Sequence, residues 1–131
     1  MAKSVAELIA GADTVVPRID KTKAEELISG SNVVVVDVRD APEVEKSGKI
    51  AGAIHVSRGM LEFRADPACK YHDKAFSRDK IYILYCASGG RSALSGKTLL
   101  DLGYSNVYNL GAFEEWVKAG GRIEKPIEPG M

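Results

Sequence analysis

Two apolar runs, one of them broken only by Asp37, constrain the fold of this chain more than any other feature. One covers residues 33–38 (VVVVDV), and the other covers residues 81–85 (IYILY). Neither run alternates between apolar and polar residues, so each is typical of a strand that is buried on both faces. Such strands occur in parallel sheets that are covered by helices on both sides.

Helical and extended patterns alternate around these two runs. Gly11 is predicted to end the first helix, while Asp20 is predicted to cap the second and Gly30 to end it. Helices are predicted at 3–11, 21–29, 92–102 and 112–119, shorter helical segments at 42–46 and 60–64, and further strands at 15–19, 54–56 and 107–110. This order predicts an α/β fold, an open, mostly parallel five-stranded sheet with helices on both faces.

Length and composition fit one soluble domain. We expect residues 1–131 to form a single domain with its core at about 17–122, an N-terminal helix and a short C-terminal tail. Lysine plus arginine is 18 and aspartate plus glutamate is 18, which argues against a nucleic-acid or membrane partner. No apolar run approaches the roughly 20 residues that span a bilayer. The start lacks the apolar stretch of a signal peptide, and the two cysteines form no disulfide framework, so a cytoplasmic location is expected.

A cysteine stands at the end of the second apolar run. Cys86 is followed by a short loop and then by the helix that is predicted from Ser92. A helix N-terminus and a nearby cation stabilise a thiolate, and the backbone N–H groups of a tight loop can converge on one anion. Cys86 is therefore the candidate nucleophile. The candidate binding residues of the loop are Ala87, Ser88, Gly89, Gly90 and Arg91.

The length of this loop separates two kinds of chemistry. Cys86 and Arg91 have four residues between them, whereas cysteine-dependent phosphatases have five, which surround a phosphate. The shorter loop should enclose a smaller group, such as one sulfur atom bound to the cysteine. Phosphatases of that type also usually carry a histidine before the cysteine, where this chain has Tyr85. A cysteine phosphatase or an arsenate reductase is the less favoured reading.

Four motifs in the right order resemble the rhodanese-like, single-domain sulfurtransferase family over about residues 17–122. Two departures are Lys49, where the family usually has histidine, and Ala112, where a second glycine is usual. The matching segments are 37–39 (DVR), 43 with 48–56 (GKIAGAIHV), 86–91 (CASGGR) and 102–116 (LGYSNVYNLGAFEEW).

The resemblance implies a sulfurtransferase with a ping-pong mechanism. The Cys86 thiolate would take sulfur from a small-molecule donor such as thiosulfate and pass it, as a persulfide, to a thiol or a protein acceptor. Neither a metal nor an organic cofactor is implied. A non-catalytic interaction domain or persulfide carrier of the same shape is the alternative.

Two arginines have candidate roles beside the nucleophile. Arg91 is expected either to contact the anionic group of the donor or to brace the loop by bonding to carbonyls, and the sequence does not choose between them. Arg58 follows the strand at 54–56 and could bind an anionic donor at the mouth of the site. Ser88 could donate a hydrogen bond to the persulfide.

Other polar residues have structural interpretations. Asp37 and Arg39 are expected to hold loops through hydrogen bonds and a charge pair. His55 and His72 have no partner signature, so no catalytic role is assigned to them. Cys69, in a polar loop, could be a resolving thiol but is interpreted as an ordinary loop cysteine.

Overall fold

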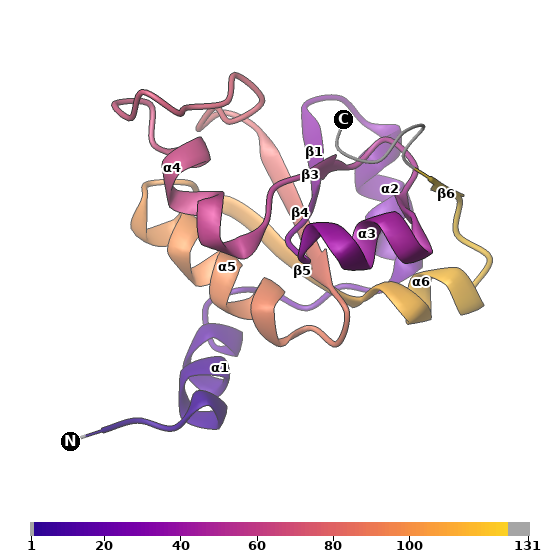
Figure 1. Ribbon diagram of the computed structural model, residues 1–131, viewed down its shortest axis with the longest axis horizontal. Coiled ribbons are helices and arrows are strands. Elements are labelled where there is room, and N and C mark those ends of the chain that lie inside the picture. Colours follow the sequence, from indigo (N-terminus) through magenta and orange to yellow (C-terminus); the bar gives the residue numbers. More distant parts are fainter. Residues whose placement is uncertain (1, 126–131) are drawn as a thin grey trace.

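The computed structural model describes residues 2–125 and contains a four-stranded parallel sheet at its centre (Figure 1). Its strands run in the spatial order β3-β1-β4-β5. They are β1 (Val33–Asp37), β3 (Ile54–His55), β4 (Ile81–Cys86) and β5 (Asn106–Ala112). The predicted α/β class with a mostly parallel sheet is confirmed.

The fifth strand, which the sequence places at residues 15–19, is reduced to a single bridge. Arg18 pairs in parallel with Asn109 at the outer edge of β5. The Ile19 N–H donates to the Asn109 carbonyl, and the Asn109 N–H donates to the Pro17 carbonyl. Pro17 has no N–H to donate, which is why a longer strand does not form there.

A second, two-stranded sheet has no counterpart in the sequence predictions. It pairs β2 (Lys49–Ile50) with β6 (Ile123–Glu124) in antiparallel register. Strands of two residues are too short to show a period in the sequence. The pair is supported by an ion pair of 2.5 Å between Lys49 Nζ and Glu124.

The helices follow the predicted pattern with two differences. The cap at Asp20 and the stop at Gly30 are confirmed, since the Asp20 side chain accepts from the Lys23 N–H at 2.9 Å. The stop at Gly11 is wrong, because the first helix runs on until it is capped at Thr14. The helix predicted from Ser92 begins two residues earlier, at Gly90. The helices are α1 (Val5–Asp13), α2 (Lys21–Ser29), α3 (Ala41–Ser47), α4 (Leu61–Ala65) after the 3₁₀ turn η1 (Arg58–Met60), α5 (Gly90–Asp101) and α6 (Phe113–Lys118).

Helices cover both faces of the sheet, with α4 and α5 on one side and α2, α3 and α6 on the other (Figure 1). Successive residues of β4 point to opposite faces, as the pleat of a strand requires. Tyr82 and Leu84 pack in the core that includes residues of α4 and α5, while Ile83 and Tyr85 pack with residues of α2 and α6. This two-sided burial is what the unalternating apolar runs predicted, and it leaves the carboxyl end of β4 at the edge where parallel strands end.

None of the helices between Ala2 and Lys125 has the length and apolar character to cross a bilayer. Helix α1 projects from the body of the molecule near the N-terminus (Figure 1). The predicted C-terminal tail is described only as far as Lys125, and residues 126–131 lie outside the described part. The assignment of residues 1–131 to one domain stays a prediction.

Candidate active site

Cys86 is the last residue of β4, with β1 on one side and β5 on the other. Its side chain is fully buried at 0% exposure. The next two residues, Ala87 and Ser88, are exposed, and the chain then turns at Gly89 into α5. Gly89 has a φ of 101°, which an L side chain rarely adopts, so glycine permits this turn. The loop therefore folds back over the sulfur.

Hydrogen-bond donors converge on the Cys86 sulfur. The Gly89 N–H donates to Sγ at 3.0 Å, and the Ser92 Oγ lies 3.4 Å from it. Burial alone would raise the pKa of the Cys86 thiol. The Ser92 hydroxyl and the N–H groups of Ser92, Gly89 and Ser88 outweigh that effect, so the pKa is lowered. More of the thiol is then present as the nucleophilic thiolate at neutral pH.

Ser92 and Asn109 form a buried polar pair behind the loop. The Ser92 hydroxyl lies 2.7 Å from Asn109 Oδ1 and 3.4 Å from the Cys86 sulfur, so its single proton can be donated to either of these two acceptors. The Asn109 Nδ2 donates to the Gly89 carbonyl at 3.1 Å. Both side chains are fully buried. Sequence reasoning assigned neither a role in the site. The signal for Ser92 was its place directly after Arg91, but Asn109 comes from another strand and carries no local signal.

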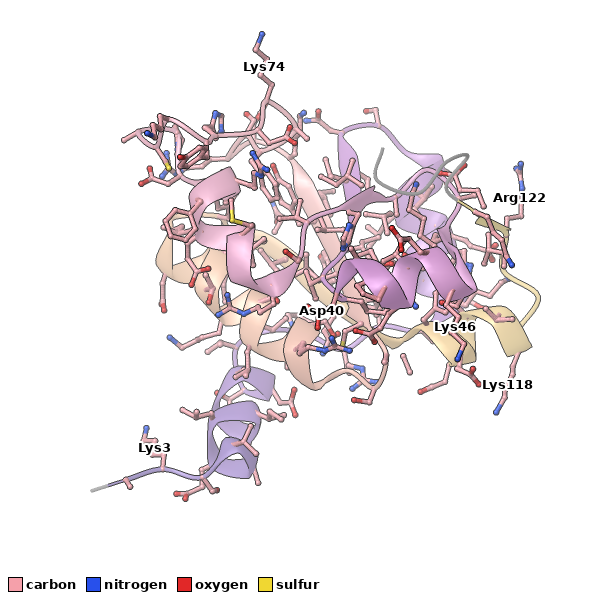
Figure 2. The ribbon with its side chains drawn as sticks, in the orientation of Figure 1. Lys3, Asp40, Lys46, Lys74, Lys118 and Arg122 are labelled. Carbon is pink, nitrogen blue, oxygen red and sulfur yellow. The ribbon has the colours of Figure 1, made fainter. Side chains whose placement is uncertain are left out.

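Arg91 holds the start of α5 against α3. Its Nη1 and Nη2 donate to the two carboxylate oxygens of Glu43 at 2.7 and 2.9 Å, and Asp40 lies 3.9 Å from Nη1. Figure 2 shows Asp40 at the start of α3. The hydrogen bonds from Arg91 lower the pKa of Glu43 to about 2. The pKa of Arg91 is raised, mainly by its hydrogen bonds to Glu43 and to a smaller extent by the nearby charge of Cys86. Of the two roles left open by the sequence, this geometry supports bracing, although the partner is the Glu43 carboxylate and not the carbonyls that were expected. Contact with a donor stays a prediction.

Two other predicted binding residues, Ala87 and Arg58, lie in different surroundings. Ala87 borders a cavity of about 210 Å³ that is also lined by Glu43, Lys46 and Phe113. Arg58 lies in η1, where its guanidinium donates to Glu62 at 2.9 Å and to Thr98 at 3.0 Å. These partners occupy Arg58, so its role at the mouth of the site stays a prediction without geometric support.

Asp37 and Arg39 form the predicted structural pair. The Arg39 Nη2 donates to the Asp37 carboxylate at 2.7 Å and to the Gly48 carbonyl at 2.6 Å. The guanidinium also lies 4.2 Å from the centre of the Phe113 ring. Together these contacts tie the end of β1 to α3, β2 and α6.

The histidines and the second cysteine lie in ordinary structural positions. The His55 Nε2 lies 2.7 Å from the Arg39 carbonyl, and the His72 Nε2 lies 3.1 Å from the Phe76 carbonyl. Cys69 is a free, half-buried thiol in a turn between Asp66 and His72. Within residues 2–125, histidine, cysteine, aspartate and glutamate side chains form no group that could hold a metal ion.

The sequence profile of the rhodanese-like domain family matches residues 20–119 of this chain. The chain belongs to the rhodanese-like domain family. A thiosulfate sulfurtransferase GlpE from Coxiella burnetii is 33% identical over 100 residues, which are 76% of this chain and 85% of that protein. The resemblance that the four motifs indicated is therefore confirmed for the family.

Two solved structures extend the comparison to three dimensions. A protein of unknown function from Rhodopseudomonas palustris, described as a possible tyrosine phosphatase, is 38% identical with a TM-score of 0.87, and the match covers 95% of this chain and 96% of that one. A homodimeric polysulfide-sulfur transferase from Wolinella succinogenes is 25% identical with a TM-score of 0.71, over 94% and 88% of the two chains. This chain is therefore similar both to proteins named as sulfurtransferases and to one structure described as a possible tyrosine phosphatase.

Proposed function

We propose that this rhodanese-like protein is a sulfurtransferase that carries sulfur as a persulfide on Cys86. The observation that supports this most strongly is the convergence of the Gly89 N–H and the Ser92 hydroxyl on a buried Cys86 sulfur. Similarity to a thiosulfate sulfurtransferase and to a polysulfide-sulfur transferase supports the same chemistry.

The first half-reaction loads the cysteine. The Cys86 thiolate attacks the outer sulfur of a donor such as thiosulfate, a new S–S bond forms, and the bond to the sulfonate sulfur breaks. Sulfite leaves with the electron pair of the broken bond, so charge and atoms balance without an external oxidant. The terminal sulfur of the persulfide is then an anion, which the N–H groups of the loop stabilise in the manner of an oxyanion hole.

The second half-reaction unloads the cysteine. An acceptor thiolate attacks the outer sulfur of the persulfide, a bond forms between acceptor and sulfur, and the Cys86 thiolate departs with the electron pair. The same donors that lower the pKa of Cys86 make this thiolate a better leaving group. We propose a small-molecule donor and a thiol or protein acceptor in the cytoplasm.

The phosphatase reading is weaker on geometric grounds. A phosphoryl group needs an arginine that closes over its oxygens, and the Arg91 guanidinium is instead bound in a fork by Glu43. The loop also holds only four residues between Cys86 and Arg91. We expect no turnover of an aryl phosphate by this protein.

The test is the intact mass of the protein after incubation with thiosulfate, beside the Cys86→Ser variant. A gain of one sulfur atom in the wild type alone, reversed by cyanide or by excess thiol, is the expected result. If neither thiosulfate nor polysulfide adds sulfur to the wild type, the proposal is wrong. Hydrolysis of an aryl phosphate that depends on Cys86 would favour the phosphatase reading instead.

A further inference from the structure

We propose that Arg18 recognises the anionic group of the sulfur donor or acceptor, an inference that rests on the proposed sulfurtransferase function. Sequence analysis assigned no role to Arg18, because it lies far from Cys86 in the chain. The structure brings its guanidinium against the loop that holds the nucleophile.

Two glycines make room for the Arg18 side chain. A Cβ atom added to Gly89 would lie 3.1 Å from Arg18 Nη1, and one added to Gly111 would overlap Nη2. That overlap excludes any side chain at Gly111, so the guanidinium occupies space that only glycine leaves free. One of these glycines is the residue whose N–H donates to the Cys86 sulfur.

Asn109 fixes Arg18 relative to the nucleophile. Its backbone pairs with the segment that carries Arg18, through bonds to Pro17 and Ile19. Its side chain donates to the Gly89 carbonyl at 3.1 Å. One buried residue therefore holds both the arginine segment and the loop, which limits their relative movement.

Arg18 differs from the other arginines of this region in having no acidic partner. Arg39 is paired with Asp37, Arg58 with Glu62, and Arg91 with Glu43. Within the part of the chain from residue 2 to residue 125, no carboxylate lies at ion-pair distance from Arg18, whose side chain is exposed. It borders a groove of about 590 Å³ whose lining also includes Trp116 and the carboxylates of Asp20 and Glu115, neither of which pairs with the guanidinium. A guanidinium in this setting is free to bind an oxyanion through two parallel N–H donors.

The distance to the sulfur suits a short substrate. The contacts at Gly89 and standard covalent lengths place Arg18 Nη1 no more than about 9 Å from Cys86 Sγ. A hydrogen bond of about 2.8 Å and an approach of roughly 3.3 Å between reacting atoms take up most of that distance. At this upper limit about 3 Å remains between the attacked sulfur and the anionic oxygen, so a compact substrate is long enough to reach both groups. Thiosulfate has its oxyanion at this spacing. A short thiol that carries a carboxylate attacks the outer persulfide sulfur, about 2 Å beyond Sγ, and needs to span no more than thiosulfate does.

Alkylation of Cys86 tests this site without any sulfur transfer. Iodoacetate and iodoacetamide have nearly the same shape and differ in charge, so the ratio of their rates at Cys86, followed by peptide mass, reports a nearby cation. We expect Arg18→Gln to lower the iodoacetate-to-iodoacetamide ratio by about three- to tenfold, the effect of a cation a few ångströms from a carboxylate near a protein surface. Arg18→Lys should retain part of the ratio.

Arg122→Gln is the matched control, because Arg122 is also exposed and lies beyond α6, away from α5 (Figure 2). It should leave the ratio unchanged. Thermal unfolding of each variant checks the fold, and an exposed Arg18 should tolerate glutamine. An unchanged ratio in folded Arg18→Gln would overturn the proposal.

Two kinetic arms then identify which substrate Arg18 recognises. In the first, loading of Cys86 by thiosulfate is measured in single turnover, and a slower reaction in Arg18→Gln assigns Arg18 to the donor. In the second, the loaded protein is unloaded by 3-mercaptopropionate or by its neutral amide, and loss of a preference for the acid assigns Arg18 to the acceptor. No change in either arm would overturn a role in substrate recognition. A wild type that takes up no sulfur but keeps the Arg18-dependent alkylation ratio would instead contradict the proposed function.

Discussion

The two cysteines of this protein lie in loops of very different construction. Cys86 ends a central strand, is fully buried, and receives hydrogen bonds from the turn into α5. Cys69 is half-buried in a turn, and among residues 2–125 no hydrogen-bond donor contacts its sulfur. Burial by itself makes a thiol harder to ionise. The contrast indicates that converging donors, rather than access to solvent alone, lower the pKa of the Cys86 thiol.

Removing each thiol in turn should have the largest effect on this comparison. Cys86→Ser should reduce sulfur transfer by at least about a thousandfold, because a serine hydroxyl is not ionised at neutral pH and forms no persulfide. Cys69→Ser should stay within about twofold of the wild type. Steady-state transfer from thiosulfate to cyanide measures both. Loss of activity in Cys69→Ser of normal stability would show that the second cysteine takes part.

Removing the buried hydroxyl beside Cys86 should make the reactivity of this thiol more like that of Cys69. Ser92→Ala removes the hydroxyl that can turn its proton from Asn109 Oδ1 to the Cys86 thiolate, and hydrogen bonds to charged groups contribute about 1.5–3 kcal/mol. We expect the pKa of Cys86 to rise and loading at neutral pH to slow by roughly tenfold or more. The pH dependence of iodoacetamide labelling at Cys86 measures the pKa.

Ser95→Ala is the matched control for Ser92→Ala. The Ser95 Oγ donates to the Arg91 carbonyl at 2.6 Å in the same helix and is likewise buried, but no hydrogen bond links it to the Cys86 sulfur. Ser95→Ala should leave the pH dependence of iodoacetamide labelling at Cys86 unchanged. A profile that moves equally in both variants would mean that helix stability, and not the hydroxyl, sets the pKa.

These residues also show what the sequence could and could not predict. The runs at 33–38 and 81–85 predict the two central strands of the sheet, because a strand that is buried on both faces does not alternate between apolar and polar residues. The loop from Cys86 to Arg91 is continuous in sequence, so its glycines and its nucleophile could be recognised together. These local features made the fold class and the candidate nucleophile accessible.

Contacts between distant segments were not accessible in the same way. β5 shifts its register against β4 between Leu84 and Tyr85, so that Asn109 pairs with the first and Gly111 with the second. This irregularity places Asn109 behind the loop and Gly111 beneath Arg18, and no local pattern announces it. The bond from Arg91 to Glu43 likewise depends on where α3 packs, which is why the sequence left two roles open for Arg91.

Loosening the Arg91 brace should have the smallest effect, and one that depends on pH. The pKa of Glu43 is about 2 in the folded protein, below its value of 4.5 in the unfolded chain. Its charge therefore stabilises the fold above about pH 4.5, and this contribution is lost as pH falls toward about 2.

The variant that tests this brace is Glu43→Gln. Because the ion pair is partly exposed, we expect Glu43→Gln to cost about 1 kcal/mol or less at pH 7 and to flatten the acid limb of stability. Denaturant unfolding at pH 7 and pH 3 checks this. If the wild type exceeds Glu43→Gln in free energy of unfolding by the same amount at pH 7 and pH 3, the expected role of this ion pair is wrong.

The most direct test of the central claim is to locate the transferred sulfur between the two cysteines. Protein treated with thiosulfate is alkylated, digested without reductant and mapped by mass, so that each cysteine peptide reports whether it carries an extra sulfur. We predict the extra sulfur on the peptide that contains Cys86 and none on the peptide that contains Cys69. Sulfur on Cys69 alone, or on neither peptide under any donor, would contradict the account.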